Sequence, residues 1–463
     1  MATHRLQRRD LLKLLGGGAL AATLAACAPQ TAAPTQAPKA EPTKPAPTAG
    51  AAPTTPAKPT EAAAKPTAAP GQAGQKVVVR YWDFQQSDKS ILDAQQKAIQ
   101  EFQQANPNIE IQVEVTPYPQ YRDKLLVAAR GGNPPDIATL DQIWTSEFAA
   151  SGSIIPLDDY IKASSVKREL FFPGAWDSNV WRGQTWGIPL NNDVWQELYF
   201  NVELFEQAGL DPTKPPATWE ELTEAARKLT KAPDVYGLAV YGEKSEVIAV
   251  VMDSWIYSNG GKIISDDSTK ALINAPEAVA ALEHYVSLVE FAPPGTPNRG
   301  ENEAINLFTT GKVAMGLFGS WQQDTIKQRA PTMKWDLAMC PAPAGKQFHG
   351  TLGGWNMAIF KASKNPDAAW KYVEFLTGKE VQKTVNSLIP ARNDAGKEFV
   401  EALRKRPDVI LKTVETGLPR PISPVYPQIS EVQQNMMQEI LAGAKVQEAA
   451  DKAAREIERI LKG

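Results

Sequence analysis

The feature that most constrains the fold is an alternation of strand and helix patterns at the start of the globular sequence. Residues 76–82 are a β-branched run that predicts a buried strand, and strict apolar alternation over 109–115 predicts a strand with one buried face. Helical faces over 92–102 and 121–128 separate these strands from a third at 136–140. The order strand–helix–strand–helix–strand implies parallel strands with helices on both faces, which is an α/β fold.

Polar and aromatic residues follow two of these strands. Trp82 and Asp83 come at the end of the first strand, and Asp141 and Trp144 follow the third. Ligands of open α/β sheets bind beyond the carboxyl ends of the strands, so these four residues are candidates for a binding site. A core role for either tryptophan remains open.

Residues 186–201 predict a crossing between two lobes. Pro189 bars a regular helix, and the stretch is too rich in aromatic and β-branched residues for a surface loop. Three short polar residues, 191–193, lie in its middle between Trp186 and Trp195. We interpret the stretch as extended chain that leaves one lobe, passes a binding cleft and enters a second lobe. The alternative, an ordinary core strand with a polar turn, stays open.

The N-terminus has the architecture of an export signal. A basic region precedes an apolar run, 11–26, which is shorter than the ~20 residues that a membrane-spanning helix needs. Residues 8–13 resemble a twin-arginine motif, and residues 24–27 resemble a bacterial lipobox. We therefore predict a lipoprotein signal over 1–27 that ends at a lipidated Cys27. A plain secretory signal is the alternative.

Residues 28–75 consist almost entirely of Pro, Ala, Thr, Lys, Gln and Glu. Such a segment has no apolar periodicity and cannot bury a core. Its proline content favours extended chain. We predict a disordered tether that spaces the globular part from the membrane.

Composition and motifs exclude several classes of function. The formal net charge of -3 offers no electrostatic footprint for nucleic acid. The two cysteines are Cys27 and Cys340, and lipidation of the first would leave the second without a partner, so no disulfide framework is expected. The chain shows no G-x-x-x-x-G-K-[ST], G-x-S-x-G or H-E-x-x-H motif and no Cys/His metal spacing. The sequence therefore predicts no metal and no cofactor.

Other patterns predict packing roles. Thr218 and Glu221 have the spacing of a capping box, which makes Trp219 a packing residue of the helix that follows. Trp335 lies on a predicted strand and is expected in the core, whereas His284 is expected at the surface. Two helices are expected at the C-terminus.

Short motifs then occur in an order that resembles one family along 77–461. The chain resembles the extracellular solute-binding proteins of family 1, the sugar-binding receptors of ABC importers related to maltose-binding protein. The motifs that carry the resemblance, in chain order, are 106–109, 131–137, 152–157, 187–189, 199–201, 216–222, 311–315, 319–321 and 353–355.

The resemblance implies a two-lobed periplasmic-binding-protein-like fold. Each lobe would be a mainly parallel sheet flanked by helices, with residues 76–190 plus 345–391 in lobe 1 and 196–340 plus 396–463 in lobe 2. Crossing hinge segments would let the lobes close on a ligand. The closed protein, expected to be a monomer, would dock on the membrane permease subunits of an ABC importer outside the cell membrane, in the periplasm or the open medium.

The resemblance also implies ligand contacts, carried over position by position. A pyranose has apolar faces and a rim of hydroxyls, which suits rigid tryptophan faces and hydrogen-bonding Asp, Asn and Arg side chains. The ligand is therefore expected to be a mono- or oligosaccharide. The candidates are Trp82, Asp83, Asp141, Trp144, Asn192, Asp193, Trp255, Trp321, Gly354, Trp355, Arg392 and Tyr426.

Three alternatives compete with a sugar receptor. A receptor for a glycerol phosphate, polyamine or peptide would have the same fold, but a phosphate site needs converging cations, and Arg392 is the one basic candidate. A secreted glycan-active enzyme could use paired carboxylates such as Asp83, Asp141 and Asp193, although hydroxyl recognition explains them more simply. A structural surface lipoprotein without ligand would have little use for so many tryptophans at strand ends.

Overall fold

The computed structural model describes residues 76–84 and 89–463. The predicted signal, Cys27 and the tether lie outside the described residues. Among the described residues, no helix is long and apolar enough to cross a bilayer.

The predicted strand–helix order is confirmed at the start of the globular part. The elements are β1 (Val77–Asp83), α1 (Lys89–Ala105), β2 (Ile109–Val115), α2 (Tyr118–Arg130) and β3 (Ile137–Asp141). Strand β1 pairs in parallel with both β2 and β3. The carboxyl ends of the three strands therefore meet at one edge of the sheet.

Two later strands complete the first sheet, whose order is β2-β1-β3-β13-β6. Strand β13 (Trp355–Ile359) is antiparallel to β3 and to β6 (Ile188–Pro189), and its register places Trp355 opposite Asp141. Helices cover both faces, because α1 and α12 (Pro366–Leu376) share one apolar cluster while α2 and α3 (Gln142–Ala150) share the other.

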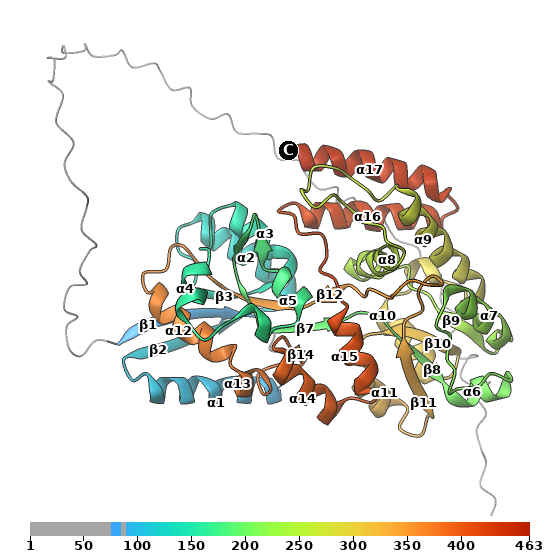
Figure 1. The fold of residues 1–463 in the computed structure, drawn as a ribbon, viewed down its shortest axis with the longest axis horizontal. Coiled ribbons are helices and arrows are strands. Elements are labelled where there is room, and N and C mark those ends of the chain that lie inside the picture. The colour runs from blue at the N-terminus through green and yellow to red at the C-terminus, as the bar shows by residue number, and fades with distance from the viewer. Residues whose placement is uncertain (1–75, 85–88) are drawn as a thin grey trace, which may run out of the picture. The chain divides into compact units, whose positions relative to one another are not determined.

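The second sheet forms the other lobe (Figure 1). Its order is β11-β8-β10-β9, built from β8 (Glu197–Asn201), β9 (Tyr236–Ala239), β10 (Val313–Phe318) and β11 (Trp335–Met339). Strand β8 is antiparallel to both neighbours, and β10 and β9 are parallel. The sheet is thus more mixed than predicted, because β8 enters directly from the crossing segment rather than through a crossover helix.

The crossing predicted at 186–201 is confirmed. Strand β7 (Asn191–Val194) lies between β6 of the first sheet and β8 of the second. It pairs antiparallel with β12 (Leu352–Gly353) and β14 (Ile389–Pro390), which gives a three-stranded ribbon, β12-β7-β14. Three passes of the chain therefore run side by side at the junction of the lobes.

Helices surround the second sheet and the crossing ribbon. The two predicted C-terminal helices are confirmed as α16 and α17. In chain order the remaining α-helices and strands of both lobes are α4 (Asp158–Ala163), α5 (Pro173–Asp177), β4 (Val180–Trp181), β5 (Gln184–Thr185), α6 (Val202–Gln207), α7 (Trp219–Leu229), α8 (Glu246–Ser258), α9 (Pro276–Ser287), α10 (Glu301–Thr309), α11 (Gln322–Arg329), α13 (Lys379–Gln382), α14 (Asn393–Leu403), α15 (Pro407–Glu415), α16 (Tyr426–Leu441) and α17 (Val446–Lys462).

The packing predictions have mixed outcomes. The Thr218–Glu221 capping box is present, and Trp219 and Trp335 are buried as predicted. The prediction for His284 is wrong: its ring stacks on Trp219 at 4.5 Å between centroids and 3° between planes, because the helix turns it toward the core aromatics.

Two further residues complete the comparison of packing. Val115 ends β2 with 42% of its surface exposed, so the buried face predicted for 109–115 stops before it. Cys340 is a buried free thiol.

Candidate functional site

Asp141 lies where β3 meets α3, at the carboxyl edge of the first sheet. Its carboxylate caps α3 by accepting a hydrogen bond from the Ile143 amide at 3.3 Å. It also accepts from the Tyr118 hydroxyl at 2.9 Å and from Arg420 Nη2 at 3.0 Å. Asp141 is only 4% exposed, so these donors replace the water that it loses on folding.

Arg420 connects Asp141 to the second lobe. Its Nη1 donates to Glu246 Oε1 at 2.9 Å, and Glu246 is the first residue of α8. Glu246 also accepts from the Tyr426 hydroxyl at 2.7 Å and from the Ser430 hydroxyl. We call Asp141, Arg420 and Glu246 the Arg420 bridge; it joins the first sheet to helices of the second lobe.

The opposite charges of the Arg420 bridge stabilise one another's charged forms. Burial acts to lower the pKa of Arg420, but Asp141 and Glu246 outweigh it, so the pKa is raised and the guanidinium stays charged. Burial raises the pKa of Asp141, while Arg420 and the Tyr118 hydroxyl act in the opposite direction. The guanidinium fork uses a different nitrogen for each carboxylate, which a lysine could not reproduce.

An aromatic cluster lies beside Asp141. Trp144 stacks on Tyr118 with 5.3 Å between ring centroids, and Phe84 meets Trp355 edge-to-face at 4.8 Å. The ring centroids of Trp355 and Tyr118 are also 6.2 Å apart. We call Phe84, Tyr118, Trp144 and Trp355 the aromatic cluster. Trp355 is only partly buried, and 42% of Tyr118 is exposed, so part of the cluster's surface can meet a ligand.

A second tryptophan pair lies in the second lobe. Trp321 meets Trp195 edge-to-face at 4.9 Å, and its Nε1 donates to Glu301 Oε1 at 2.7 Å. Gln322 donates to the same oxygen at 2.7 Å. The Trp321 ring is thus fixed by one hydrogen bond and one ring contact while its side chain remains partly exposed.

The polar residues of the crossing are buried between the lobes. Asp193 accepts from the Ser320 hydroxyl at 2.6 Å and from the Val194 amide at 2.8 Å. Burial raises the pKa of Asp193 to about 6, although both hydrogen bonds act to lower it. Within the part of the chain that the structure describes, neither carboxylate oxygen of the neighbouring Glu197 has a hydrogen-bond partner. Asn192 points its amide at the Ile389 and Pro390 carbonyls, 3.4 Å from each.

Pockets adjoin the Arg420 bridge on the second-lobe side. One of about 570 Å³ falls within the range of ligand pockets. Its lining is Tyr257, residues 260–266, Ser268, His349 and residues 418–422. On the other side of the same segment, the space between α3 and residues 419–422 measures only about 10 Å³, which is room for about one water molecule.

Two candidates at the end of β1 lie at the margin of the aromatic cluster. The Trp82 ring carries the Lys124 ammonium 4.3 Å from its centroid. Asp83 is fully buried and accepts from the Phe84 amide at 2.8 Å and from Gln95 Nε2 at 2.9 Å. Both residues are thus held by neighbours within the first lobe.

Three candidates, Gly354, Trp255 and Arg392, have evident structural roles. Gly354 approaches the crossing so closely that a Cβ would lie 2.3 Å from the Asn191 carbonyl oxygen. Trp255 is 1% exposed among Trp219, His284 and Tyr285 of the second-lobe core.

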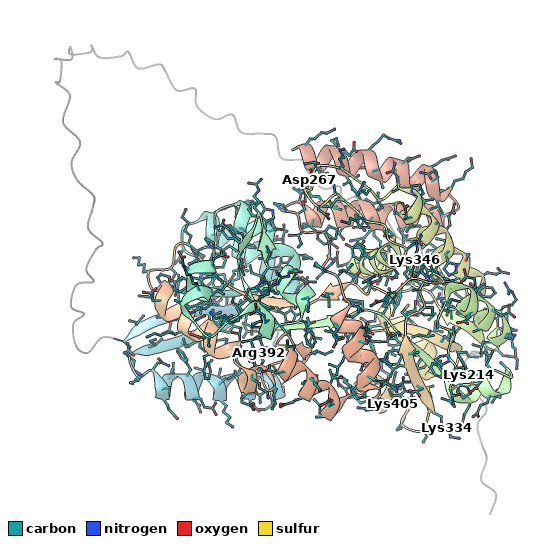
Figure 2. The ribbon with its side chains drawn as sticks, viewed as in Figure 1. Lys214, Asp267, Lys334, Lys346, Arg392 and Lys405 are labelled. Atoms are coloured by element: carbon teal, nitrogen blue, oxygen red, sulfur yellow. The ribbon has the colours of Figure 1, made fainter. Side chains whose placement is uncertain are left out.

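Arg392 precedes α14 (Figure 2), where its guanidinium pairs with both carboxylate oxygens of Asp394 at 3.0 Å. The structure therefore gathers Asp141, Trp144, Trp355 and Tyr426 around the Arg420 bridge. It keeps Trp255 and Arg392 apart from them.

Sequence reasoning missed Arg420, Glu246 and Tyr118. Arg420 lies in an irregular segment without strand or helix periodicity, and its one signal is the pair of prolines that flank it. Glu246 begins a helix, where acidic residues are common because they offset the helix dipole, and Tyr118 begins another helix without any motif around it.

The fold and the site define a class. Two α/β lobes, a crossing ribbon and side chains that meet between the lobes are the architecture of periplasmic-binding-protein-like receptors. The chain belongs to the bacterial extracellular solute-binding protein family, whose model matches residues 87–383.

Similar proteins and solved structures support this assignment. The chain is 30% identical over 373 residues to a binding protein of Brucella abortus (strain 2308), covering 78% of this chain and 88% of that protein. A solute-binding protein of Thermotoga lettingae TMO, solved with α-D-tagatose, has a TM-score of 0.70 and 30% identity and covers 83% of this chain and 100% of its own. Maltose-bound T. maritima MalE3 has a TM-score of 0.68 and 26% identity, with coverages of 83% and 100%.

Proposed function

We propose that this protein is the carbohydrate-binding receptor of an ABC importer. The observation that carries the proposal is the partly exposed aromatic cluster beside the hydrogen-bonding Asp141, at the carboxyl edge of the first sheet. Relatives of the same fold are described as bound with a tagatose and with maltose. A sugar offers the two surfaces that such a site matches, an apolar ring face and a hydroxyl rim.

The sugar would lie between the lobes. Trp355 and Tyr118 would contact its ring face from the first lobe, Trp321 would approach from the second, and Asp141 would accept hydroxyl hydrogen bonds. A hydroxyl left unpaired in a closed site costs about 1–3 kcal/mol, which is the source of selectivity. The other candidates named from the sequence, and the lobe boundaries, remain predictions.

A neutral ligand is favoured over a phosphate ester or an acidic peptide. The Arg420 guanidinium is shared by two carboxylates, and Arg392 is paired with Asp394. A phosphate needs uncommitted donors, several of them cationic. Within the part of the chain that the structure describes, Arg420 Nε has no hydrogen-bond partner, but one buried donor does not supply the several that a phosphate needs.

We further propose that the protein is not an enzyme and that it works at the outer face of the cell membrane. The family consists of binding proteins, and Asp141 and Asp193 are engaged as hydrogen-bond acceptors. Cys27 would carry the lipid anchor, residues 28–75 would form the tether, and the closed monomer would deliver sugar to permease subunits.

A thermal-shift screen of the purified protein tests the proposal. The panel would contain tagatose, maltose and longer maltosaccharides, with glycerol 3-phosphate and a polyamine as competing classes. A ligand at 100 times its dissociation constant stabilises the protein by about 2.7 kcal/mol, which a melting curve resolves. We expect a neutral sugar to raise the melting temperature and to be recovered unchanged.

Two matched variants test whether the sugar that raises the melting temperature binds at the aromatic cluster. Trp355→Ala should abolish the sugar-dependent shift, whereas Trp370→Ala, which removes a tryptophan stacked on Tyr160 elsewhere in the first lobe, should retain it. A shift produced only by the phosphate ester or the polyamine would overturn the sugar assignment. Cleavage of the sugar would overturn the receptor assignment.

A further inference from the structure

Glu301 lies beside Trp321 in the second lobe and is the first residue of α10. Its Oε1 accepts hydrogen bonds from Trp321 Nε1 and from Gln322 Nε2, both at 2.7 Å. Within the part of the chain that the structure describes, Oε2 accepts no hydrogen bond and Glu301 forms no ion pair. Because Glu301 is only partly buried, one carboxylate oxygen is committed to protein donors while the other stays open.

Gln322 adds a second acceptor to the same place. The residue is 6% exposed, and its Oε1 has no hydrogen-bond partner among the described residues. A buried acceptor without a donor costs free energy, so its position needs an explanation. The helix dipole also favours negative charge at the N-terminus of α10, where Glu301 lies. This part of the second lobe is therefore matched by a ligand that brings hydrogen-bond donors.

The Trp321 ring is held at the junction of the lobes. It meets Trp195 edge-to-face with 4.9 Å between ring centroids. Trp195 in turn packs on the crossing ribbon, because its Nε1 lies 3.1 Å from the position that a Cβ on Gly353 would take. The Ser320 hydroxyl donates to Asp193 at 2.6 Å, which ties the turn before the ring to the same ribbon. The carboxylate that orients this ring is thus placed where the proposed sugar meets the second lobe.

The two lobes differ in the acceptor capacity that remains. An ionised carboxylate has about four lone-pair sites. Asp141 accepts three hydrogen bonds, from the Ile143 amide, the Tyr118 hydroxyl and Arg420, which leaves about one site. Glu301 accepts two, both on Oε1, which leaves about two sites on Oε2. Two sites on one oxygen suit two neighbouring hydroxyl donors.

We propose that Glu301 is the hydroxyl acceptor of the second lobe and the residue that orients Trp321. Its Oε1 fixes the ring through the Nε1 hydrogen bond, and its Oε2 accepts from hydroxyls of the sugar that lies against that ring. Hydrogen bonds to a carboxylate are stronger than those between neutral groups, so Glu301 selects sugars with hydroxyls beside the stacked face. This inference rests on the proposed function and assigns a specificity-determining residue to it.

The test is isothermal titration calorimetry with tagatose, maltose and maltotriose. The sugar among these that binds the parent protein most tightly is used for every variant. Glu301→Gln keeps the size of the side chain and an oxygen that can accept from Trp321, but it removes the charge, so we expect an affinity lower by about tenfold. Glu301→Ala removes both the contact and the positioning, so we expect a loss of roughly 30-fold or more.

A second background separates direct contact from positioning. Trp321→Phe keeps an aromatic ring but removes the Nε1 donor, so Glu301 no longer orients the ring in that background. Adding Glu301→Ala to Trp321→Phe should still lower the affinity by about fivefold. The matched control is Glu303→Gln on the same helix. It replaces a carboxylate whose pair with Arg299 spans 3.5 Å, and it should leave the affinity within about twofold of the parent's.

Each other outcome decides against a stated part of the proposal. An affinity close to the parent's in both Glu301→Gln and Glu301→Ala overturns the inference and leaves the sugar receptor intact. An unchanged affinity on adding Glu301→Ala to Trp321→Phe overturns the direct contact. If circular dichroism shows that Glu301→Ala does not fold, Glu301→Gln decides, alone and combined with Trp321→Phe. Failure of all three sugars to bind the parent overturns the proposed function and this inference with it.

Discussion

Replacing Asp193 with asparagine should change how stability depends on pH. Burial raises the pKa of Asp193 from 3.8 to about 6. The folded protein therefore keeps this proton to a higher pH than the unfolded chain, and its free energy of unfolding falls as the pH rises from about 4 to about 6. At 1.36 kcal/mol per pKa unit, the loss amounts to about 3 kcal/mol. Asparagine cannot titrate, so this loss is absent in Asp193→Asn.

The assay is urea unfolding followed by tryptophan fluorescence at a series of pH values. The quantity to compare is the parent's free energy of unfolding minus that of Asp193→Asn, which should fall by about 3 kcal/mol between pH 3 and pH 7. The control, Asp394→Asn, should give a difference of opposite slope, because Arg392 lowers the pKa of Asp394. A flat or rising difference for Asp193→Asn would refute the argument that burial controls this carboxyl.

Three further substitutions test local packing, each by urea unfolding. Gly354→Ala should lower the free energy of unfolding by about 1–3 kcal/mol, because its Cβ would lie 2.3 Å from the Asn191 carbonyl oxygen. Thr218→Ala should lower it by about 1 kcal/mol, because it removes the capping bond to the Glu221 amide, and Thr218→Ser should restore most of the loss. Trp255→Ala should lower it by about 3–5 kcal/mol through loss of core packing, while the sugar affinity of the folded variant stays within a few-fold of the parent's.

The fold was predictable where local pattern and tertiary environment agree. Strand β3 is buried along its whole length and is mostly apolar in the sequence, and Thr218 with Glu221 marks a helix start by spacing alone. Pairing across long separations was not readable in this way. Strand β13 joins the first sheet next to β3 but in the opposite direction, and nothing in its own residues encodes a direction.

The site was partly predictable for a related reason. Asp141 and Trp144 come at the end of a recognisable strand. Because ligands of open α/β sheets bind beyond the carboxyl ends of strands, both residues could be predicted as candidates. Trp255 follows polar residues in the sequence, as a binding residue could, yet its side chain points into the core. A tryptophan's identity does not say which face of its element it occupies.

Arg420 shows the limit most clearly. Its function as a bridge depends on two carboxylates that lie 279 and 174 residues away along the chain, and no periodicity connects such positions. What the sequence does contain is a charged residue between two prolines, a place where stiff backbone holds a long side chain out from irregular chain. A buried arginine requires partners, so the proline pair predicts a fixed guanidinium but not what it holds. The partners of Arg420 come together only in the folded protein, where the two lobes meet. Sequence patterns near Arg420 therefore could not assign its role.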